Sequence, residues 1–187
     1  ARRLEPLLLV LFPLRWILTP LALLFRLRQD RADFFVADGF LIGDTVLIRP
    51  LLRACLAAGG RVAYMGGPHA PAILADLAVI HRRFQWPWAT YRRDLATLFE
   101  LLRLWAHLYT RQPRTIIEVR GDVRGLAFLF LACPAKLVGY SFTGGRRLLD
   151  GEPTGMEGHA HLEAHHEALA RLLKLDYRRE SVFVDAD

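Results

Sequence analysis

The sequence has little cysteine and almost no lysine. Cys55 and Cys133 are its only cysteines, too few for a disulfide framework or a cysteine-based zinc site. Both fall in apolar helical stretches, which indicates a reducing, cytosolic compartment. Lys136 and Lys174 are the only lysines, so every other basic residue is arginine. This predominance of arginine is typical of coding bias, and it also suits bidentate binding of phosphate or carboxylate.

The chain also lacks the composition of a disordered protein. Only 24% of its 187 residues are charged and 53% are hydrophobic. That is enough for one sizeable core, since domains commonly have about 100–200 residues. The formal net charge is +6. A positive charge favours anionic partners, namely phospholipid, nucleic acid or a phosphorylated substrate.

One long apolar run stands out, at Leu7–Phe25. It has about the length that crosses a bilayer, but Arg15 lies near its middle, and Pro13 and Pro20 interrupt the helical hydrogen-bond ladder. Arginines outnumber acidic residues around it. We therefore predict a membrane-associating helical segment at residues 1–31, lying in the interface of an anionic leaflet; spanning the bilayer and folding against the domain are the alternatives.

Beyond residue 31, predicted strands and helices alternate. This order predicts an α/β fold, a Rossmann-like parallel sheet with helices on both faces, over residues 32–187. The predicted strands lie at residues 33–38, 61–65, 78–80, 115–119 and 136–140. The predicted helices after the first loop lie at residues 71–77, 94–109, 123–132 and 157–175, and a further extended segment is expected at 181–184.

The most informative stretch follows the first predicted strand, which ends at Asp38. A loop with Gly39 and Gly43 leads into a helix that opens at Asp44 or Thr45. In an open parallel sheet such a connection lies outside the carboxyl ends of the strands, where ligands bind. The carboxylate of Asp44 in the middle of it favours chemistry beside a ligand over simple phosphate binding.

Three blocks of residues carry a resemblance to a known family. They are residues 42–53, the segment Glu118-Val119-Arg120-Gly121, and residues 135–140 followed by 144–149. In order and spacing they resemble the first loop and helix, the acidic-x-Arg-Gly segment and the following strand and loop of glycosyltransferase family 9. This is the family of the ADP-heptose:lipopolysaccharide heptosyltransferases, and the similarity covers residues 33–176.

The resemblance implies the N-terminal half of a two-domain GT-B fold. In that family the N-terminal domain binds the acceptor sugar-lipid and the C-terminal domain binds the nucleotide-sugar donor, so we expect the donor-binding domain to be absent from this chain. The implied reaction transfers a heptose-like sugar from an ADP-sugar to a lipid-linked, anionic acceptor in lipopolysaccharide or related glycan biosynthesis. It would take place at the cytoplasmic face of a bacterial inner membrane. ADP-heptose would be a co-substrate, and neither a cofactor nor a metal is expected.

Asp44 is the candidate catalytic residue. The family's catalytic aspartate falls in this Gly-Asp loop, which implies that Asp44 is the general base for the acceptor hydroxyl. Its competing role is a helix N-cap, in which N–H bonds to the carboxylate would weaken it as a base. Thr45, Gly39 and Gly43 are predicted to lie against the substrate. Capping is the competing role of Thr45, and simple turn geometry is that of the glycines.

Four arginines are predicted to bind the acceptor. Arg120 and Arg124 follow the strand at 115–119 and are expected at the same edge of the sheet, where arginine binds phosphate or carboxylate. Their alternative is pairing with neighbouring acidic residues or with solvent. Arg146 and Arg147 lie in a glycine-containing loop after the next strand, and for them a solvated loop is the alternative.

Two other features have weaker interpretations. His161 and His165 are four residues apart, a spacing that suits zinc, but no third ligand follows at a telling distance. Residues 81–93 mix aromatic and basic side chains, which favours packing on the core or a membrane interface over nucleic acid. The alternative function is a non-catalytic, membrane-associated Rossmann-like module that binds an anionic lipid or a partner protein.

Overall fold

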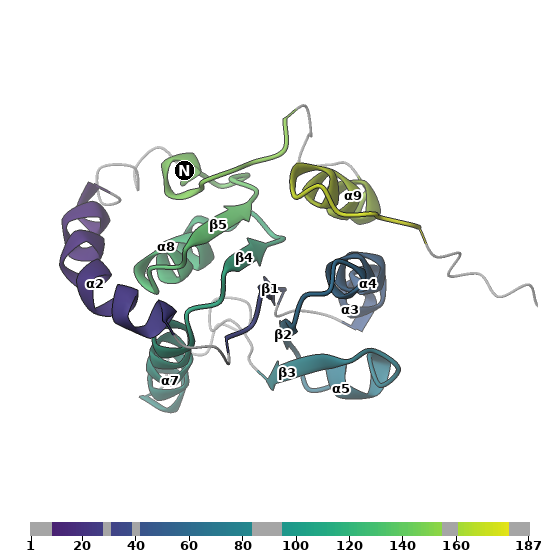
Figure 1. The fold of residues 1–187 in the computed structure, drawn as a ribbon, viewed down its shortest axis with the longest axis horizontal. Coiled ribbons are helices and arrows are strands. Elements are labelled where there is room, and N and C mark those ends of the chain that lie inside the picture. The colour runs from purple at the N-terminus through teal and green to yellow at the C-terminus, as the bar shows by residue number, and fades with distance from the viewer. Residues whose placement is uncertain (1–8, 28–30, 39–41, 84–94, 155–160, 180–187) are drawn as a thin grey trace, which may run out of the picture.

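The computed structural model describes residues 9–27, 31–38, 42–83, 95–154 and 161–179. Five short strands alternate with helices over most of this length (Figure 1). In chain order the elements are α2 (Leu11–Arg26), β1 (Phe34–Ala37), α3 (Ile42–Leu47), α4 (Arg49–Ala57), β2 (Val62–Gly66), α5 (Ala70–Ile73), β3 (Val79–Arg83), α7 (Leu95–Arg111), β4 (Thr115–Glu118), α8 (Val123–Leu131), β5 (Lys136–Gly139), the 3-10 helix η2 (Arg146–Leu148) and α9 (Leu162–Leu172).

The strands form one parallel sheet in the order β3-β2-β1-β4-β5. This confirms the predicted α/β fold with a parallel sheet. All five residues of β2 are buried, as expected for a strand covered on both faces. In the register of the central strands, Ala37 of β1 lies beside Met65 of β2 and Glu118 of β4. The carboxyl ends of these strands therefore meet at one edge.

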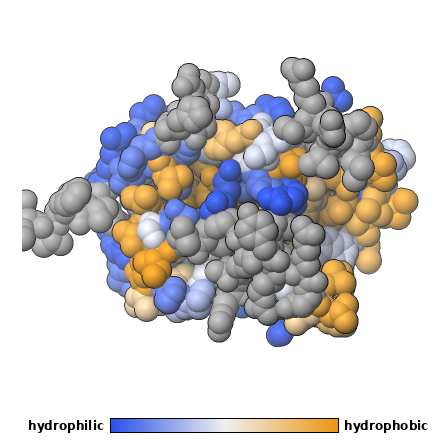
Figure 2. All heavy atoms as spheres, turned by 180° about the vertical axis from the view of Figure 1, so that it is seen from behind, coloured by the Kyte–Doolittle hydropathy of each residue, from blue (hydrophilic) through white to orange (hydrophobic). Residues whose placement is uncertain are grey.

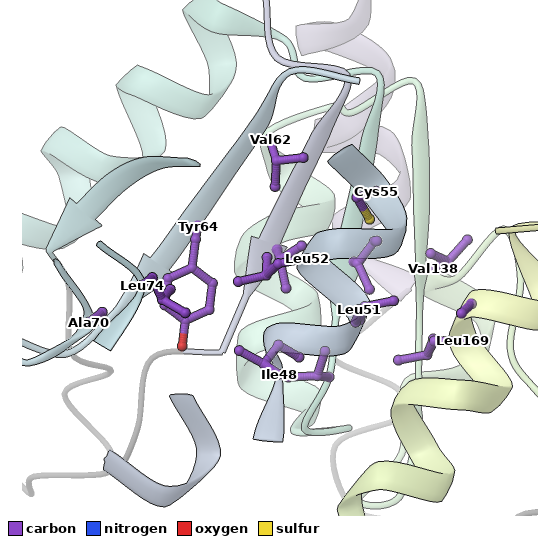
Figure 3. Packing of buried hydrophobic residues seen from close by; sticks show 14 of the residues in the cluster. Ile48, Leu51, Leu52, Cys55, Val62, Tyr64, Ala70, Leu74, Val138 and Leu169 are labelled. Atoms are coloured by element: carbon purple, nitrogen blue, oxygen red, sulfur yellow. The ribbon is translucent and has the colours of Figure 1, made fainter. Parts of the chain in front are cut away.

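Helices cover both faces of the sheet (Figure 1). On one face, buried side chains of α7 and α8 pack with strand residues such as Phe35 and Ile116. On the other face, α4 and α9 pack against the strands, and Figure 3 shows Leu51 of α4 lying among the buried side chains of that cluster, which includes Tyr64 and Val138. The sequence of strand and crossover thus gives a doubly wound sheet.

The helix after β1 differs from its prediction. It begins at Ile42, two residues before Asp44, so that Asp44 lies in the first helical turn. A break then separates α3 from α4, because Pro50 lacks the N–H that would bond to the carbonyl of Val46. Proline is compatible with the first turn of a new helix, and α4 begins one residue before it, at Arg49.

Two other helices are shorter than predicted. α5 ends at Ile73 instead of residue 77, and the following turn brings the carboxylate of Asp76 to the guanidinium of Arg49. α9 ends at Leu172 instead of residue 175, because Lys174 adopts a left-handed conformation that terminates the helix. The predicted cap at residue 94 and the extended segment at residues 181–184 lie outside the described residues.

The N-terminal helix α2 packs on the outside of α7 and α8. Ala22 is fully buried there, and the ring of Phe12 meets that of Phe130 edge-on at 5.2 Å between centroids. Within the part of the chain that the structure describes, no helix combines the length and the apolarity needed to cross a membrane.

Gly139 gives the first testable prediction. A Cβ at this position would lie 2.3 Å from the backbone oxygen of Glu118 in the neighbouring strand. We expect Gly139→Ala to lower the free energy of unfolding by about 1–3 kcal/mol, as overpacking commonly does. Urea denaturation measures the change.

Gly43→Ala is the matched control, because a Cβ there has no heavy atom within 4 Å. It should leave the unfolding free energy within about 1 kcal/mol of the parent or raise it, since alanine favours a helix. Equal destabilisation by both variants would contradict the close approach of β5 and β4.

Candidate active site at the carboxyl edge of the sheet

The order of the strands places a switch point between β1 and β4. From β1 the chain crosses to α3 and α4 on one face, and from β4 it crosses to α8 on the other. At such a point the two loops separate, and ligands bind in the crevice outside the strand ends. The predicted site residues follow these strands: Asp44 lies in the first turn of α3 and Arg120 in the loop between β4 and α8.

Asp44 and Arg120 meet across this switch point. Nη1 of Arg120 lies 3.4 Å from Oδ2 of Asp44, although 76 positions separate the two residues in the chain. Both side chains are partly exposed, by 33% and 23%. The structure therefore brings together the candidate base and one candidate anion-binding arginine at a place that solvent or a ligand can reach.

The buried carboxylate of Glu118 shapes the turn that carries Arg120. Its Oε2 accepts hydrogen bonds from the backbone N–H of Gly121 at 2.6 Å and of Arg120 at 3.2 Å. Gly121 has a φ of +70°, and a Cβ there would lie 2.7 Å from the ring of Phe142. Glycine is therefore required for this turn. Burial raises the pKa of Glu118 to about 8.

A second polar group lies beneath Asp44. Tyr64 Oη donates to Oδ2 of Asp38 at 2.7 Å, and Thr45 Oγ1 lies 3.3 Å from Tyr64 Oη. Because the phenol has one proton and gives it to Asp38, Thr45 donates to Tyr64. Burial raises the pKa of Asp38 to about 6, with the nearby charge of Asp44 acting in the same direction. Arg120 lies within the electrostatic reach of both aspartates.

The other predicted substrate-binding residues are placed less uniformly. The side chain of Thr45 is buried, and its hydrogen bond with Tyr64 joins α3 to the sheet. Gly43 is exposed in the first turn of α3, with open space where a Cβ would be. Gly39 lies outside the described residues.

Three predicted arginines do not gather around Asp44. Arg124 forms two side-chain bonds with Asp122, the N-cap of α8, at 2.6 and 3.0 Å, which is the pairing that the sequence offered as the alternative. Arg146 pairs with Glu152 at 2.8 Å. Arg147 lines an open groove with α2, on the far side of α8 from α3.

Two histidines of α9, His165 and His166, are buried and contact other elements of the fold. His166 is buried, and its Nδ1 lies 3.0 Å from the carbonyl oxygen of Leu47, which joins α9 to α3. His165 is buried against the rings of Tyr140 and Phe142. Among the residues that the structure describes, no three histidine, cysteine or acidic side chains are grouped as metal ligands would be.

Sequence reasoning missed Tyr64 as part of this site, and it named Glu118 within the acidic-x-Arg-Gly segment without giving it a role. Both lie in apolar strands and are buried, so their sequence surroundings resemble those of core residues. A polar residue inside a strand that is otherwise apolar is the signal that could have identified them, since buried polar groups need partners.

The raised pKa of Glu118 predicts a specific pH dependence of stability. Between the pKa of an exposed glutamate and about 8, the folded protein keeps a proton that the unfolded chain has released, so raising the pH destabilises the fold. We expect the contribution of Glu118 to the free energy of unfolding to fall by about 1 kcal/mol per pH unit from about pH 7 to pH 8.

Glu118→Gln should flatten this dependence, because the amide keeps an oxygen acceptor and does not titrate. The difference between the two proteins isolates Glu118, because the histidines whose pKa values are lowered by burial, His81, His107 and His166, are the same in both. Chemical denaturation of both proteins at several pH values is the measurement. Parallel curves for parent and variant above about pH 7 would contradict the assignment.

No protein-family model matches the chain, and no curated protein sequence does. Solved structures do match. E. coli heptosyltransferase WaaC with ADP-2-deoxy-2-fluoro heptose has a TM-score of 0.62 and 15% identity over 79% of this chain and 50% of its own. The glycosyl transferase family 9 protein from Veillonella parvula has a TM-score of 0.57 and 11% identity over 78% of this chain and 42% of its own. E. coli ADP-heptose lps heptosyltransferase II has a TM-score of 0.54 and 12% identity over 72% of this chain and 40% of its own.

At these identities the similarity establishes the fold. The chain shares the fold of 40–50% of each of these proteins, which confirms at the level of structure the resemblance found in the sequence blocks. The chain spans about half the length of the solved structures that it matches.

Proposed function

We propose that this chain is the acceptor-side domain of an inverting glycosyltransferase. The observation that carries the proposal is the contact between Asp44 and Arg120 at the switch point of the sheet, where a carboxylate and a cation face a ligand-accessible edge. The fold shared with heptosyltransferases supports the same reaction class.

The proposed donor is an ADP-sugar with a heptose-like ring. Support comes from two of the matching E. coli WaaC structures, which hold ADP or ADP-2-deoxy-2-fluoro heptose. Because the chain spans about half of those proteins, we assign donor binding to a second domain, beyond the part of them that this chain matches. The reaction needs no further cofactor, since the nucleotide sugar already carries an activated leaving group.

In the proposed reaction Asp44 acts as the general base. The acceptor hydroxyl oxygen attacks the anomeric carbon of the donor, and the bond from that carbon to the β-phosphate oxygen breaks. The electron pair of the broken bond leaves with ADP, and the proton of the hydroxyl passes to the carboxylate of Asp44. Attack opposite the leaving group inverts the anomeric configuration.

Arg120 is proposed to position the anionic acceptor. Its guanidinium lies beside Asp44 and presents a planar fork that suits phosphate or carboxylate. Arg124, Arg146 and Arg147 remain proposed acceptor contacts. The first two are held by Asp122 and Glu152, so an acceptor would have to compete with these carboxylates.

We further propose that the acceptor is lipid-linked and that the protein works at the cytoplasmic face of a bacterial inner membrane. The net charge of +6 is compatible with an anionic acceptor and an anionic leaflet. The acceptor end would then enter the carboxyl edge of the sheet beside Asp44.

Asp44→Asn is the direct test of the base. We expect it to lower sugar transfer from ADP-heptose to a lipid A–Kdo acceptor by roughly a hundredfold or more, as loss of a general base does. The assay uses the longest reading frame that contains this chain. Asp176→Asn is the matched control, because Asp176 is a largely exposed carboxylate that pairs with Arg178, two residues further along the chain.

Unimpaired transfer by Asp44→Asn would exclude Asp44 as the base. If the intact protein binds acceptor and never transfers sugar, the non-catalytic binding module replaces the enzyme as the function. Acceptor binding is measured separately by calorimetry, so that loss of binding and loss of chemistry are distinguished.

Arg120→Ala tests acceptor positioning. Removing the guanidinium should raise KM for the acceptor about tenfold or more, the range expected for a charge-assisted contact. Arg114→Ala is the control: Arg114 precedes the same strand, at its opposite end, and pairs with Asp33 at 3.1 Å. Similar KM values for the two variants would contradict a role of Arg120 in binding.

A further inference from the structure

The outward face of α2 is apolar, which reverses the usual pattern of a surface helix. Trp16 and Ile17 are 85% and 74% exposed, and Leu24 lies on the same side of the helix. Ala22, on the opposite side, is fully buried. A water-exposed helix normally presents charged or polar side chains to solvent, and α2 presents large apolar ones.

The arginines of α2 point inward and fix its rotation. Arg15 Nη2 donates to the carbonyl oxygen of Pro134 at 3.3 Å, and Arg26 Nη2 donates to that of Cys133 at 2.9 Å. These carbonyls follow the C-terminus of α8, where positive charge is favourable. Turning the apolar face of α2 inward would break both contacts.

A second row of exposed apolar side chains lies on α7, which packs beside α2 through Trp105 and Tyr109. Leu95, Phe99 and Leu102 recur at helical spacing on the exposed side of α7, and Phe99 is 68% exposed. We call these six side chains of α2 and α7 the α2–α7 surface. In Figure 2 orange atoms gather on the side of the molecule where these helices lie. Large exposed apolar surfaces of this kind mark interaction sites.

Arginine-lined grooves border the α2–α7 surface on both sides. Beyond α7, a groove of about 520 Å³ is lined by Arg82, Arg103 and Arg111, with Glu100 as its acidic member. Beyond α2, a groove of about 540 Å³ contains Arg15 and Arg147 next to Trp16, with Asp150 as its acidic member. The surface thus combines an apolar centre with cationic margins.

We propose that the α2–α7 surface docks onto an anionic phospholipid bilayer. The apolar side chains would enter the boundary between headgroups and acyl chains, and arginines of the two grooves would contact lipid phosphates. Exposed tryptophan and arginine are both favoured at that boundary. A second copy of the chain fits less well, because a two-fold contact through this surface would bring arginine-lined margins of like charge together.

This inference depends on the chemistry of α2 and α7 and does not require sugar transfer. Asp44→Asn should leave membrane binding unchanged, so the two proposals fail separately. If both proposals hold, docking through the α2–α7 surface would keep the domain beside its lipid-linked acceptor. The candidate site at the carboxyl edge of the sheet takes no part in that docking.

Vesicle sedimentation tests the proposal. The chain, and the longest reading frame that contains it, are mixed with phosphatidylcholine vesicles with and without phosphatidylglycerol. We expect binding to the anionic vesicles, and Ile17→Glu should weaken it by more than tenfold. Leu162→Glu is the matched control, because Leu162 is an exposed leucine at the start of α9, away from α2 and α7. Circular dichroism confirms that each variant is folded.

A charge variant tests the margins. Arg103→Gln should weaken binding to anionic vesicles several-fold, whereas Arg178→Gln removes the same charge from an exposed position after α9 and should have a smaller effect. Raising the salt concentration should reduce the difference between these variants.

Four results would overturn the proposal. The first is absence of binding to both kinds of vesicle. The second is equal loss of binding in Ile17→Glu and Leu162→Glu. The third is binding by the chain and none by the longer reading frame. The fourth is a dimer in sedimentation that Ile17→Glu dissociates, without any vesicle binding. The third or the fourth result would mean that protein covers the surface.

Discussion

The candidate site depends on one buried carboxylate. Glu118 ends β4 and accepts hydrogen bonds from the backbone N–H groups of Arg120 and Gly121, so the chain turns sharply as it leaves the sheet. That turn directs Arg120 toward Asp44 in the first turn of α3. Burial disfavours the charged form of this carboxyl group, and its pKa is therefore raised to about 8. Buried ionisable groups of this kind concentrate at functional sites.

The strands and most helices could be predicted from the sequence, because apolar runs and glycines mark them. The order of the strands in the sheet could not be predicted. Four of the five are short apolar segments, and their local sequence patterns would be the same in any order. The contact of Asp44 with Arg120 follows only from β1 lying beside β4. The resemblance to family 9 selected both residues and could not supply their distance. Thr45 was expected to contact the ligand. Its side chain instead lies on the buried side of α3, where it meets Tyr64 from a neighbouring strand.

The N-terminal helix shows the same limit. Its apolar run and the arginine at its middle were evident in the sequence, and an interfacial element was the favoured interpretation. What the sequence could not show is the direction in which the arginines point, because that is set by carbonyls at the end of α8, more than a hundred residues away. The apolar side chains face outward as a consequence of those contacts.

The chain has almost no lysine, and at Arg49 and Arg26 the structure makes specific use of the arginine side chain. Arg49 donates to the carbonyl of Ile73 and to both carboxylate oxygens of Asp76, which a single ammonium group could not do in this planar arrangement. Arg26 similarly bridges Gln112 and the carbonyl of Cys133. A cation that forms several directed bonds can join a helix end, a side chain and a neighbouring element at once. Lysine at Arg26 would keep the charge of α2 and lose the geometry that holds its apolar face toward the outside.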